Sequence, residues 1–225
     1  MTSPTSPQSH YVTLCGREVH YLEWGTRGQP PLIMWHGVAR TGRDFDDLAA
    51  AMAHDRHIIV PDTIGRGLSQ WSPDPHNEYS TPFYARQATE LLDRLGLDTV
   101  DWIGTSMGAV IGIRAAAAAL QGRIRRFVLN DMGPVVAQAA LDRIRSYAGA
   151  PPRFDRVTEL EAYFRQIYKP YGYLTDTQWR RMTETSVRRL PDGGISPHYD
   201  PKITLHFNTN EEQWDNWDKL TCDML

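Results

Sequence analysis

The chain has 225 residues and a formal net charge of −3 at pH 7, with 24 Lys and Arg residues against 27 Asp and Glu residues. The basic residues are scattered, without the clustered charge by which proteins bind nucleic acid. No stretch is apolar for long enough to cross a bilayer, and Cys15 and Cys222 lack the spacing of metal ligands. These properties predict a cytoplasmic protein with no nucleic-acid partner, no membrane partner and no metal.

The N-terminal part of the chain begins with a Ser/Thr/Pro-rich segment, residues 1–9, which predicts a flexible tail. Two strand-like runs come next at residues 11–14 and 18–24, separated by the turn Cys15-Gly16-Arg17. Runs rich in β-branched and aromatic residues on both sides of a turn predict an antiparallel hairpin.

Four continuous apolar runs then alternate with helical patterns. Strands buried on both faces have such runs, and helices between them indicate βαβ units with right-handed crossovers. We therefore expect an α/β fold, a mostly parallel sheet with flanking helices, over a core of residues 10–134. The strand runs lie at residues 32–35, 57–60, 100–103 and 126–129, and the helical patterns at 45–53, 81–96 and 107–121.

The alternation of strands and helices stops after Pro134. Residues 135–219 contain helical patterns and no convincing buried strand, which predicts a helical cap inserted at the carboxyl ends of the strands. The clearest helices are expected at residues 137–147, 157–168 and 177–190. The segment also holds nine arginines, of which one or two could bind a substrate carboxylate.

The segment Gly104-Thr105-Ser106-Met107-Gly108 joins the third apolar run to a helix of small residues. The order strand, tight turn, helix, with a serine at the apex, matches the G-x-S-x-G nucleophile elbow. A serine on such a strained turn needs small residues two positions before and after it. The helix behind it offers free N–H groups to a developing oxyanion. The alternative is a Gly/Ser turn at the end of an ordinary βα unit.

Around this turn the chain resembles the α/β-hydrolase fold family, in particular its capped branch of esterases, lactonases and carbon–carbon bond hydrolases. His36-Gly37-Val38 resembles the family's oxyanion loop. Residues 61–69 resemble its Asp…Gly-x-Gly-x-Ser loop, and residues 129–134 resemble the strand end that leads into the cap.

The resemblance implies a chemistry for these residues. Ser106 would be the catalytic nucleophile that attacks the carbonyl of a small-molecule ester or lactone. The backbone N–H groups of Val38 and Met107 would form the oxyanion hole. No metal or organic cofactor is implied.

In this family the acid and the histidine of the triad come after the serine along the chain. Residues 220–225 resemble the beginning of the next core strand, so the resemblance implies that the last strands and helices, with the acid and the histidine, are missing. Only His198 and His206 come after Ser106, and both are more consistent with a cap surface or pocket wall than with a base. Asp131 is a candidate alternative acid, although a loop aspartate bonded to backbone is favoured.

Three functions remain open on this basis. The first is a serine hydrolase of a carboxylic ester or lactone, and the second is a truncated, non-catalytic remnant or binding module of the same fold. The third is an acyltransferase or carbon–carbon bond hydrolase that uses the same elbow. If no further strand covers residues 126–131, that sheet edge is unpaired, which predicts self-association.

Overall fold

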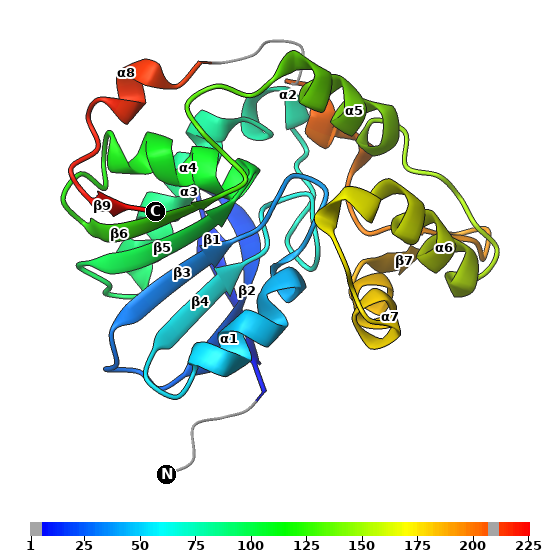
Figure 1. The fold of residues 1–225 in the computed structure, drawn as a ribbon, viewed down its shortest axis with the longest axis horizontal. Coiled ribbons are helices and arrows are strands. Elements are labelled where there is room, and N and C mark those ends of the chain that lie inside the picture. Colours follow the sequence, from blue (N-terminus) through cyan, green and yellow to red (C-terminus); the bar gives the residue numbers. More distant parts are fainter. Residues whose placement is uncertain (1–5, 207–211) are drawn as a thin grey trace.

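The computed structural model describes residues 6–206 and 212–225, which form a seven-stranded sheet with helices on both faces (Figure 1). The strand order is β1-β2-β4-β3-β5-β6-β9. β2 pairs antiparallel with β1 and with β4, and the pairs from β4 to β9 are parallel. The strands are β1 (Gln8–Leu14), β2 (Arg17–Gly25), β3 (Pro31–Trp35), β4 (His57–Pro61), β5 (Val100–Thr105), β6 (Ile124–Asn130) and β9 (Asp223–Met224).

The predicted α/β architecture, with an N-terminal antiparallel hairpin on a mostly parallel sheet, is confirmed. β1 begins at Gln8, so the last two residues of the predicted tail belong to the sheet. Residues 1–5 of that tail lie outside the described residues. The core helices are η1 (Gly42–Phe45), α1 (Asp46–Met52), α2 (Pro75–Glu78), α3 (Thr81–Arg94) and α4 (Met107–Ala116).

The central strands have continuous apolar runs because each face of the sheet packs against different helices. Successive side chains of a strand point to opposite sides. Ile33 and Trp35 of β3 therefore join the apolar cluster with α3 and α4, whereas Leu32 and Met34 join the cluster with α1. Each of these four side chains is at most 2% exposed. In the part of the chain that the structure describes, no helix is both long and apolar enough to span a membrane.

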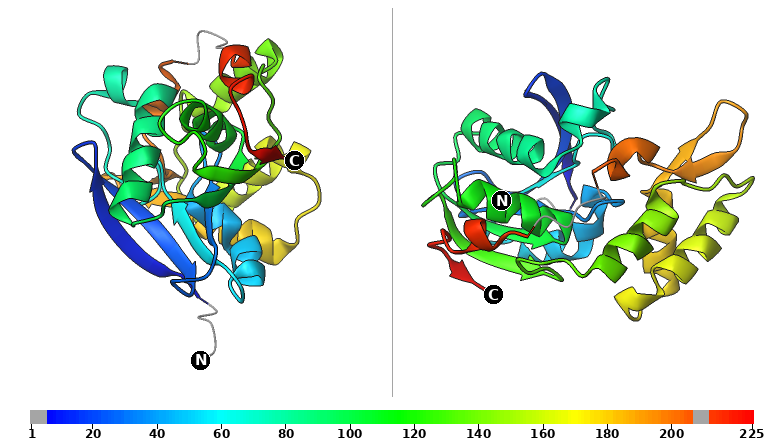
Figure 2. Two further views of the ribbon diagram at one scale, coloured as in Figure 1. Left: turned by 90° about the vertical axis from the view of Figure 1, so that its left-hand side faces the viewer. Right: turned by 90° about the horizontal axis from the view of Figure 1, so that it is seen from above.

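The segment predicted as a cap lies beside the sheet, with α6 and α7 farthest from it (Figures 1 and 2). A separate apolar cluster holds it together, with Leu160, Phe164, Tyr168, Trp179 and Ile195 at its centre. Residues 207–211 of the predicted cap lie outside the described residues. The elements of the segment are α5 (Gln138–Ala148), α6 (Val157–Ile167), η2 (Lys169–Tyr171), α7 (Asp176–Glu184), β7 (Val187–Arg189), β8 (Ile195–Pro197), η3 (Pro201–Thr204) and α8 (Trp214–Trp217).

Two parts of this segment differ from the prediction. The helix predicted over 177–190 ends at Glu184 and is succeeded by the antiparallel pair β7–β8, so the expectation of a strand-free segment was wrong there. The reason is the turn at residues 191–194, where the N–H of Leu190 donates to the carbonyl of Gly194 at 2.8 Å and closes a hairpin. In addition, α8 lies against α4 of the core, with Trp217 packed on the core cluster.

Strand β9 covers part of the sheet edge that was predicted to be bare. Asp223 and Met224 pair in parallel with Arg126 and Phe127 of β6. The N–H of Leu225 also donates to the carbonyl of Phe127 at 3.0 Å. The segment 220–225 therefore extends the sheet, as expected for a core strand, and self-association through this edge stays a prediction.

Helix α4 approaches the sheet so closely that its first turn has no room for a side chain at Gly108. A Cβ atom placed on Gly108 would lie 2.0 Å from the carbonyl oxygen of Trp35, and one on Gly104 would lie 2.4 Å from the backbone nitrogen of Ala109. Trp35 and Trp102 stack with ring centroids 5.3 Å apart, and Trp102 Nε1 donates to the carbonyl of Gly108 at 3.1 Å. The glycines therefore let α4 start directly on the sheet.

We expect Gly108→Ala to lower the free energy of unfolding by about 2 kcal/mol or more, because the added methyl group overlaps backbone that cannot move independently. Gly133→Ala is the matched control, since a Cβ atom there meets nothing within 4 Å, and its effect should stay within about 0.5 kcal/mol. Urea denaturation followed by circular dichroism measures both. Equal stability of the two variants would contradict the packing argument.

Candidate active site

Ser106 occupies the turn between β5 and α4 in a strained conformation. Its φ is 51° and its ψ is −112°, and a non-glycine residue at positive φ is held there at a cost of about 1–3 kcal/mol. The N–H of Ser106 donates to the carbonyl of Asn130 at 3.0 Å, and its carbonyl accepts from the N–H of Ala109 at 2.9 Å. Backbone bonds on both sides therefore hold the serine at the amino end of α4, where N–H groups and the helix dipole favour negative charge.

The loop after β3 lies directly beside this serine. A Cβ atom placed on Gly37 would be 3.8 Å from Cβ of Ser106. His36 is fully buried, and its Nε2 accepts from the N–H of Thr63 at 2.9 Å, so the ring proton is on Nδ1. Nδ1 donates to the carbonyl of Gly37 at 2.7 Å.

This bond polarises the peptide group that joins Gly37 to Val38. The carbonyl of Gly37 and the N–H of Val38 belong to the same peptide group, so a donor on the carbonyl strengthens the N–H as a donor. Burial lowers the pKa of His36, which keeps its ring neutral and in this arrangement. His36 is therefore a support of the loop, and both of its ring nitrogens are already bonded.

Two cavities meet at Ser106 and Val38. The larger has a volume of about 620 Å³ and a mixed wall of charged and aromatic side chains, including Asp131, Arg143 and Tyr168. The smaller has a volume of about 210 Å³. Its wall is mostly apolar, with Met107, Val110, Met132, Val136, Leu141, Ile144 and Ile203.

The structure brings most of the predicted site residues together. Ser106 and Val38 line both cavities, Met107 lines the smaller one and Asp131 the larger one. Asp131 has a positive φ of 56°, which suits an aspartate in a tight loop. None of these placements decides whether Asp131 acts as an acid, so that role stays a prediction.

The two histidines after Ser106 lie in different surroundings. His198 is not among the described residues that line the two cavities, and burial lowers its pKa. His206 lines the smaller cavity together with Ser106. Its Nε2 donates to the carbonyl of His76 at 2.7 Å, which leaves Nδ1 as the nitrogen that can accept a proton. Of the two, His206 is the one that shares a cavity with the serine.

Asp62 holds the glycine-containing loop at residues 61–69. Its carboxylate accepts from the N–H of Gly42 at 2.7 Å, from the N–H of Leu68 at 3.1 Å and from His20 Nδ1 at 2.8 Å. Burial alone would raise the pKa of Asp62, but the bonds from His20 and Gly42 hold it below its ordinary value. A buried carboxylate with this many donors is a structural residue.

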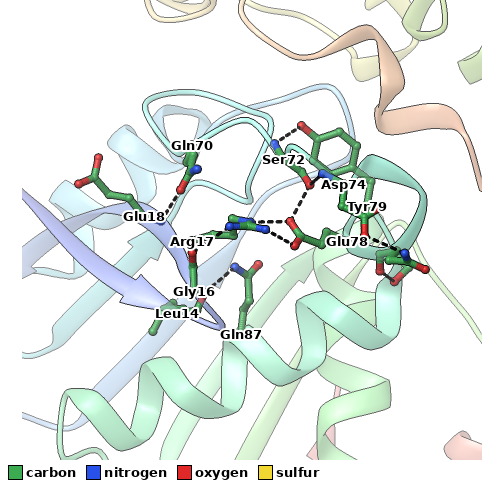
Figure 3. A network of polar contacts seen from close by, with 12 residues as sticks. Leu14, Gly16, Arg17, Glu18, Gln70, Ser72, Asp74, Glu78, Tyr79 and Gln87 are labelled. Carbon is green, nitrogen blue, oxygen red and sulfur yellow. Dashed lines mark hydrogen bonds and ion pairs between the residues drawn. The ribbon is translucent and has the colours of Figure 1, made fainter.

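A second polar network fixes the far end of the same loop (Figure 3). Glu78 accepts from Arg17 Nε at 2.7 Å and from Ser72 Oγ at 2.6 Å. The hydroxyl of Tyr79 accepts from the N–H of Ser72 at 2.9 Å and donates to Asp200 at 2.8 Å. The loop is thus tied to β2 on one side and to the segment after β8 on the other.

Two buried arginines near Ser106 were not predicted as site residues. Arg40 Nε donates to Asp44 at 2.8 Å, and its guanidinium lies over the rings of Phe164 in α6 and of Tyr168 directly after it. Arg66 lines the smaller cavity beside Ser106. In the sequence, Arg66 lies between Gly65 and Gly67 in a loop that reaches the strand ends. This pattern indicates that the residue is near the site, but it does not indicate that the side chain is buried.

No group of three or more His, Cys, Asp or Glu residues that could hold a metal ion occurs among residues 6–206 and 212–225.

Residues 30–220 match the family described as alpha/beta hydrolase fold. The chain is 39% identical over 193 residues to a 3-hydroxybutyrate-oligomer hydrolase from Cupriavidus necator, a match that covers 83% of this chain and 64% of the relative. It is 36% identical over 120 residues to an N-formylmaleamate deformylase from Pseudomonas putida, over 53% of this chain and 43% of that protein. The chain thus spans less than two thirds of the length of either relative.

A solved structure of an alpha/beta hydrolase also resembles this chain in its fold. The crystal structure of an alpha/beta hydrolase from Novosphingobium aromaticivorans superimposes with a TM-score of 0.86 and 30% identity, over 97% of this chain and 79% of that one. The family match, the sheet order and the serine turn agree, and the chain belongs to the alpha/beta hydrolase fold family.

Proposed function

We propose that the protein is a serine hydrolase of a carboxylic ester or lactone. Ser106 attacks the acyl carbon, and the N–H groups of Val38 and Met107 hold the oxygen of the tetrahedral intermediate. The observation that carries the proposal is the position of Ser106. It lies on a strained turn at the amino end of α4, where two cavities meet.

The two cavities suit the two halves of an ester. The smaller, mostly apolar one accommodates a short acyl chain, and the larger one accommodates the polar remainder of the substrate. The relative from Cupriavidus necator is named for 3-hydroxybutyrate oligomers. These are chains of short hydroxyacid esters with a carboxylate at one end, which agrees with a small apolar cavity next to a larger charged one.

Arg143 of α5 is the best candidate to bind such a carboxylate. Two cap arginines, Arg143 and Arg181, line the larger cavity. Arg181 is already paired with Asp47 of α1, with Nη1 and Oδ1 2.7 Å apart. Arg143 is exposed and forms no ion pair with another described residue, so its guanidinium is free to meet an anion.

We expect a fluorophosphonate to label Ser106 slowly, because the turn and the oxyanion hole favour attack on the electrophilic phosphorus. Intact-protein mass spectrometry after hours of incubation should show a single adduct, and peptide mapping should assign it to Ser106. Ser106→Ala should remain unlabelled. Adduct formation that survives this substitution would refute the assignment of the nucleophile.

Turnover by the 225-residue chain should be slow. Serine is a poor nucleophile without a base within about 2.6–3.2 Å, and no histidine in the described residues is bonded to the hydroxyl of Ser106. The oxyanion hole alone leaves roughly 10³–10⁴-fold acceleration over water. p-Nitrophenyl butyrate hydrolysis, with Ser106→Ala as the control, measures this. Fast turnover that His206→Ala abolishes would contradict the prediction and identify His206 as the base.

Arg143→Gln should weaken the binding of 3-hydroxybutyrate dimer by about 10-fold, because one charge-assisted hydrogen bond to the carboxylate is lost. The methyl ester of the same dimer lacks that charge, and its affinity should change little. Calorimetric titration in the Ser106→Ala protein gives both dissociation constants without turnover. Arg189→Gln is the matched control, since Arg189 is an exposed cap arginine that lines neither cavity. Equal losses for acid and ester would contradict a carboxylate contact.

A further inference from the structure

Arg66 is a buried cation with an unusual set of partners. Its side chain is 1% exposed. Nε donates to the carbonyl of Val38 at 2.7 Å, and Nη1 donates to the carbonyl of Ile64 at 2.9 Å and to the hydroxyl of Tyr84 at 2.8 Å. Nη2 lies 3.5 Å from Sδ of Met107. All four partners are uncharged.

The charge of Arg66 is therefore not neutralised by a direct contact. No carboxylate in the described part of the chain forms an ion pair with it. The rings of Tyr79 and Tyr84 lie 5.9 and 5.3 Å from its guanidinium carbon and give partial compensation. Burial of a charge without an opposite partner is expensive. Such an arrangement is consistent with a site at which negative charge develops during the reaction.

The contacts of Arg66 reach both residues of the proposed oxyanion hole. Its Nε holds the backbone of Val38, and its Nη2 holds the side chain of Met107. These two residues are 69 positions apart in the sequence, Val38 in the loop after β3 and Met107 at the start of α4. One rigid guanidinium fork thus contacts both residues, through the carbonyl oxygen of Val38 and the side-chain sulfur of Met107.

We propose that Arg66 is a positioning residue of the active site, one that sets the two oxyanion donors at their working distance and adds a fixed positive charge behind them. The inference rests on the proposed function. It predicts that Arg66 stabilises a charged tetrahedral adduct at Ser106 more than an uncharged bound substrate. A residue with a merely structural role would affect both to the same extent.

The backbone of Arg66 also connects its loop to the segment after β8. Arg66 forms an antiparallel bridge with Tyr199. On either side, the N–H of Asp200 donates to the carbonyl of Gly65 at 2.8 Å and the N–H of Gly67 donates to the carbonyl of His198 at 3.2 Å. Backbone bonds therefore prevent the arginine from shifting along its loop.

The experiment uses n-butylboronic acid as the probe. The oxygen of Ser106 adds to the trigonal boron and its proton leaves to solvent, which gives a tetrahedral, anionic adduct without any need for turnover. The affinity for the boronic acid is compared with that for the neutral methyl ester of 3-hydroxybutyrate dimer, measured in the Ser106→Ala background. Melting temperatures report whether each variant folds.

Arg66→Gln should weaken boronic acid binding by about 10-fold, less than the 10²–10³ lost with a whole oxyanion donor, and change the ester affinity by less than about 2-fold. Arg66→Lys keeps the charge without the fork, and its boronic acid affinity should be intermediate. If Arg66→Gln does not fold, the same comparison of boronic acid and ester affinities is made with Arg66→Lys.

Two results would overturn the inference. In the first, a folded variant binds the boronic acid as tightly as the unsubstituted protein. In the second, the affinities for boronic acid and ester fall together. A separate result concerns the proposed function itself, since boronic acid binding that Ser106→Ala leaves intact would reject Ser106 as the nucleophile whatever Arg66 does.

Discussion

The site depends on a close approach of three backbone segments around Ser106. The carbonyl of Trp35, the first turn of α4 and the end of β5 come together at distances that leave no space for a Cβ atom on Gly104 or Gly108. This approach forces the serine into a positive φ, and the hydrogen bonds of its own backbone keep it there. The strain is held by the sheet and α4, which are stabilised by the apolar cluster around the stacked Trp35 and Trp102. The packed core therefore holds the hydroxyl of Ser106 in its position.

Around this turn, buried polar groups hold the loops that the apolar core alone would leave free. His36 fixes the loop after β3, and Asp62 fixes the loop after β4. Arg66 contacts Val38 in the first of these loops and Met107 at the start of α4, and Arg40 connects the first loop to the rings of Phe164 and Tyr168. His36, Asp62 and Arg66 bond to backbone carbonyls or N–H groups, which need a partner when water is excluded, whereas Arg40 contacts the Asp44 carboxylate and two aromatic rings. Positions near the serine are thus determined by directed bonds, which are more specific than apolar contacts.

The parallel strands were predictable because continuous apolar runs arise when both faces of a strand are covered, as in β3 and β4. The positions of Ser106 and Met107 on a turn between a strand and a helix were predictable because such a turn imposes small residues at fixed spacing, whereas Val38 was predicted from the resemblance of residues 36–38 to the family's oxyanion loop. The hairpin β7–β8 was missed because three-residue strands show no periodicity and the helical pattern before them continues in the sequence. The burial of Arg66 and the position of His206 on the smaller cavity wall depend on contacts with residues far away in the chain. No local pattern encodes such contacts.

The segment predicted as a cap, residues 135–219, packs against two different partners. Its helices α6 and α7 share an apolar cluster with Ile195, whereas Tyr199 and Ile203, a few residues later, belong to the cluster of the core. The boundary lies near Pro197, after which the backbone bonds to the loop of Arg66. Ala148 of α5 also belongs to the core cluster. Recombination between relatives is thus easiest if a foreign segment replaces the residues after α5 up to this boundary and the host keeps α5 and its own chain from residue 198 onward. A graft that also replaced residues 198–203 would have to place its backbone so that residues 198 and 200 still bond to Gly67 and Gly65 of the host loop. We therefore expect the sequences of relatives to diverge less from residue 198 onward than before it.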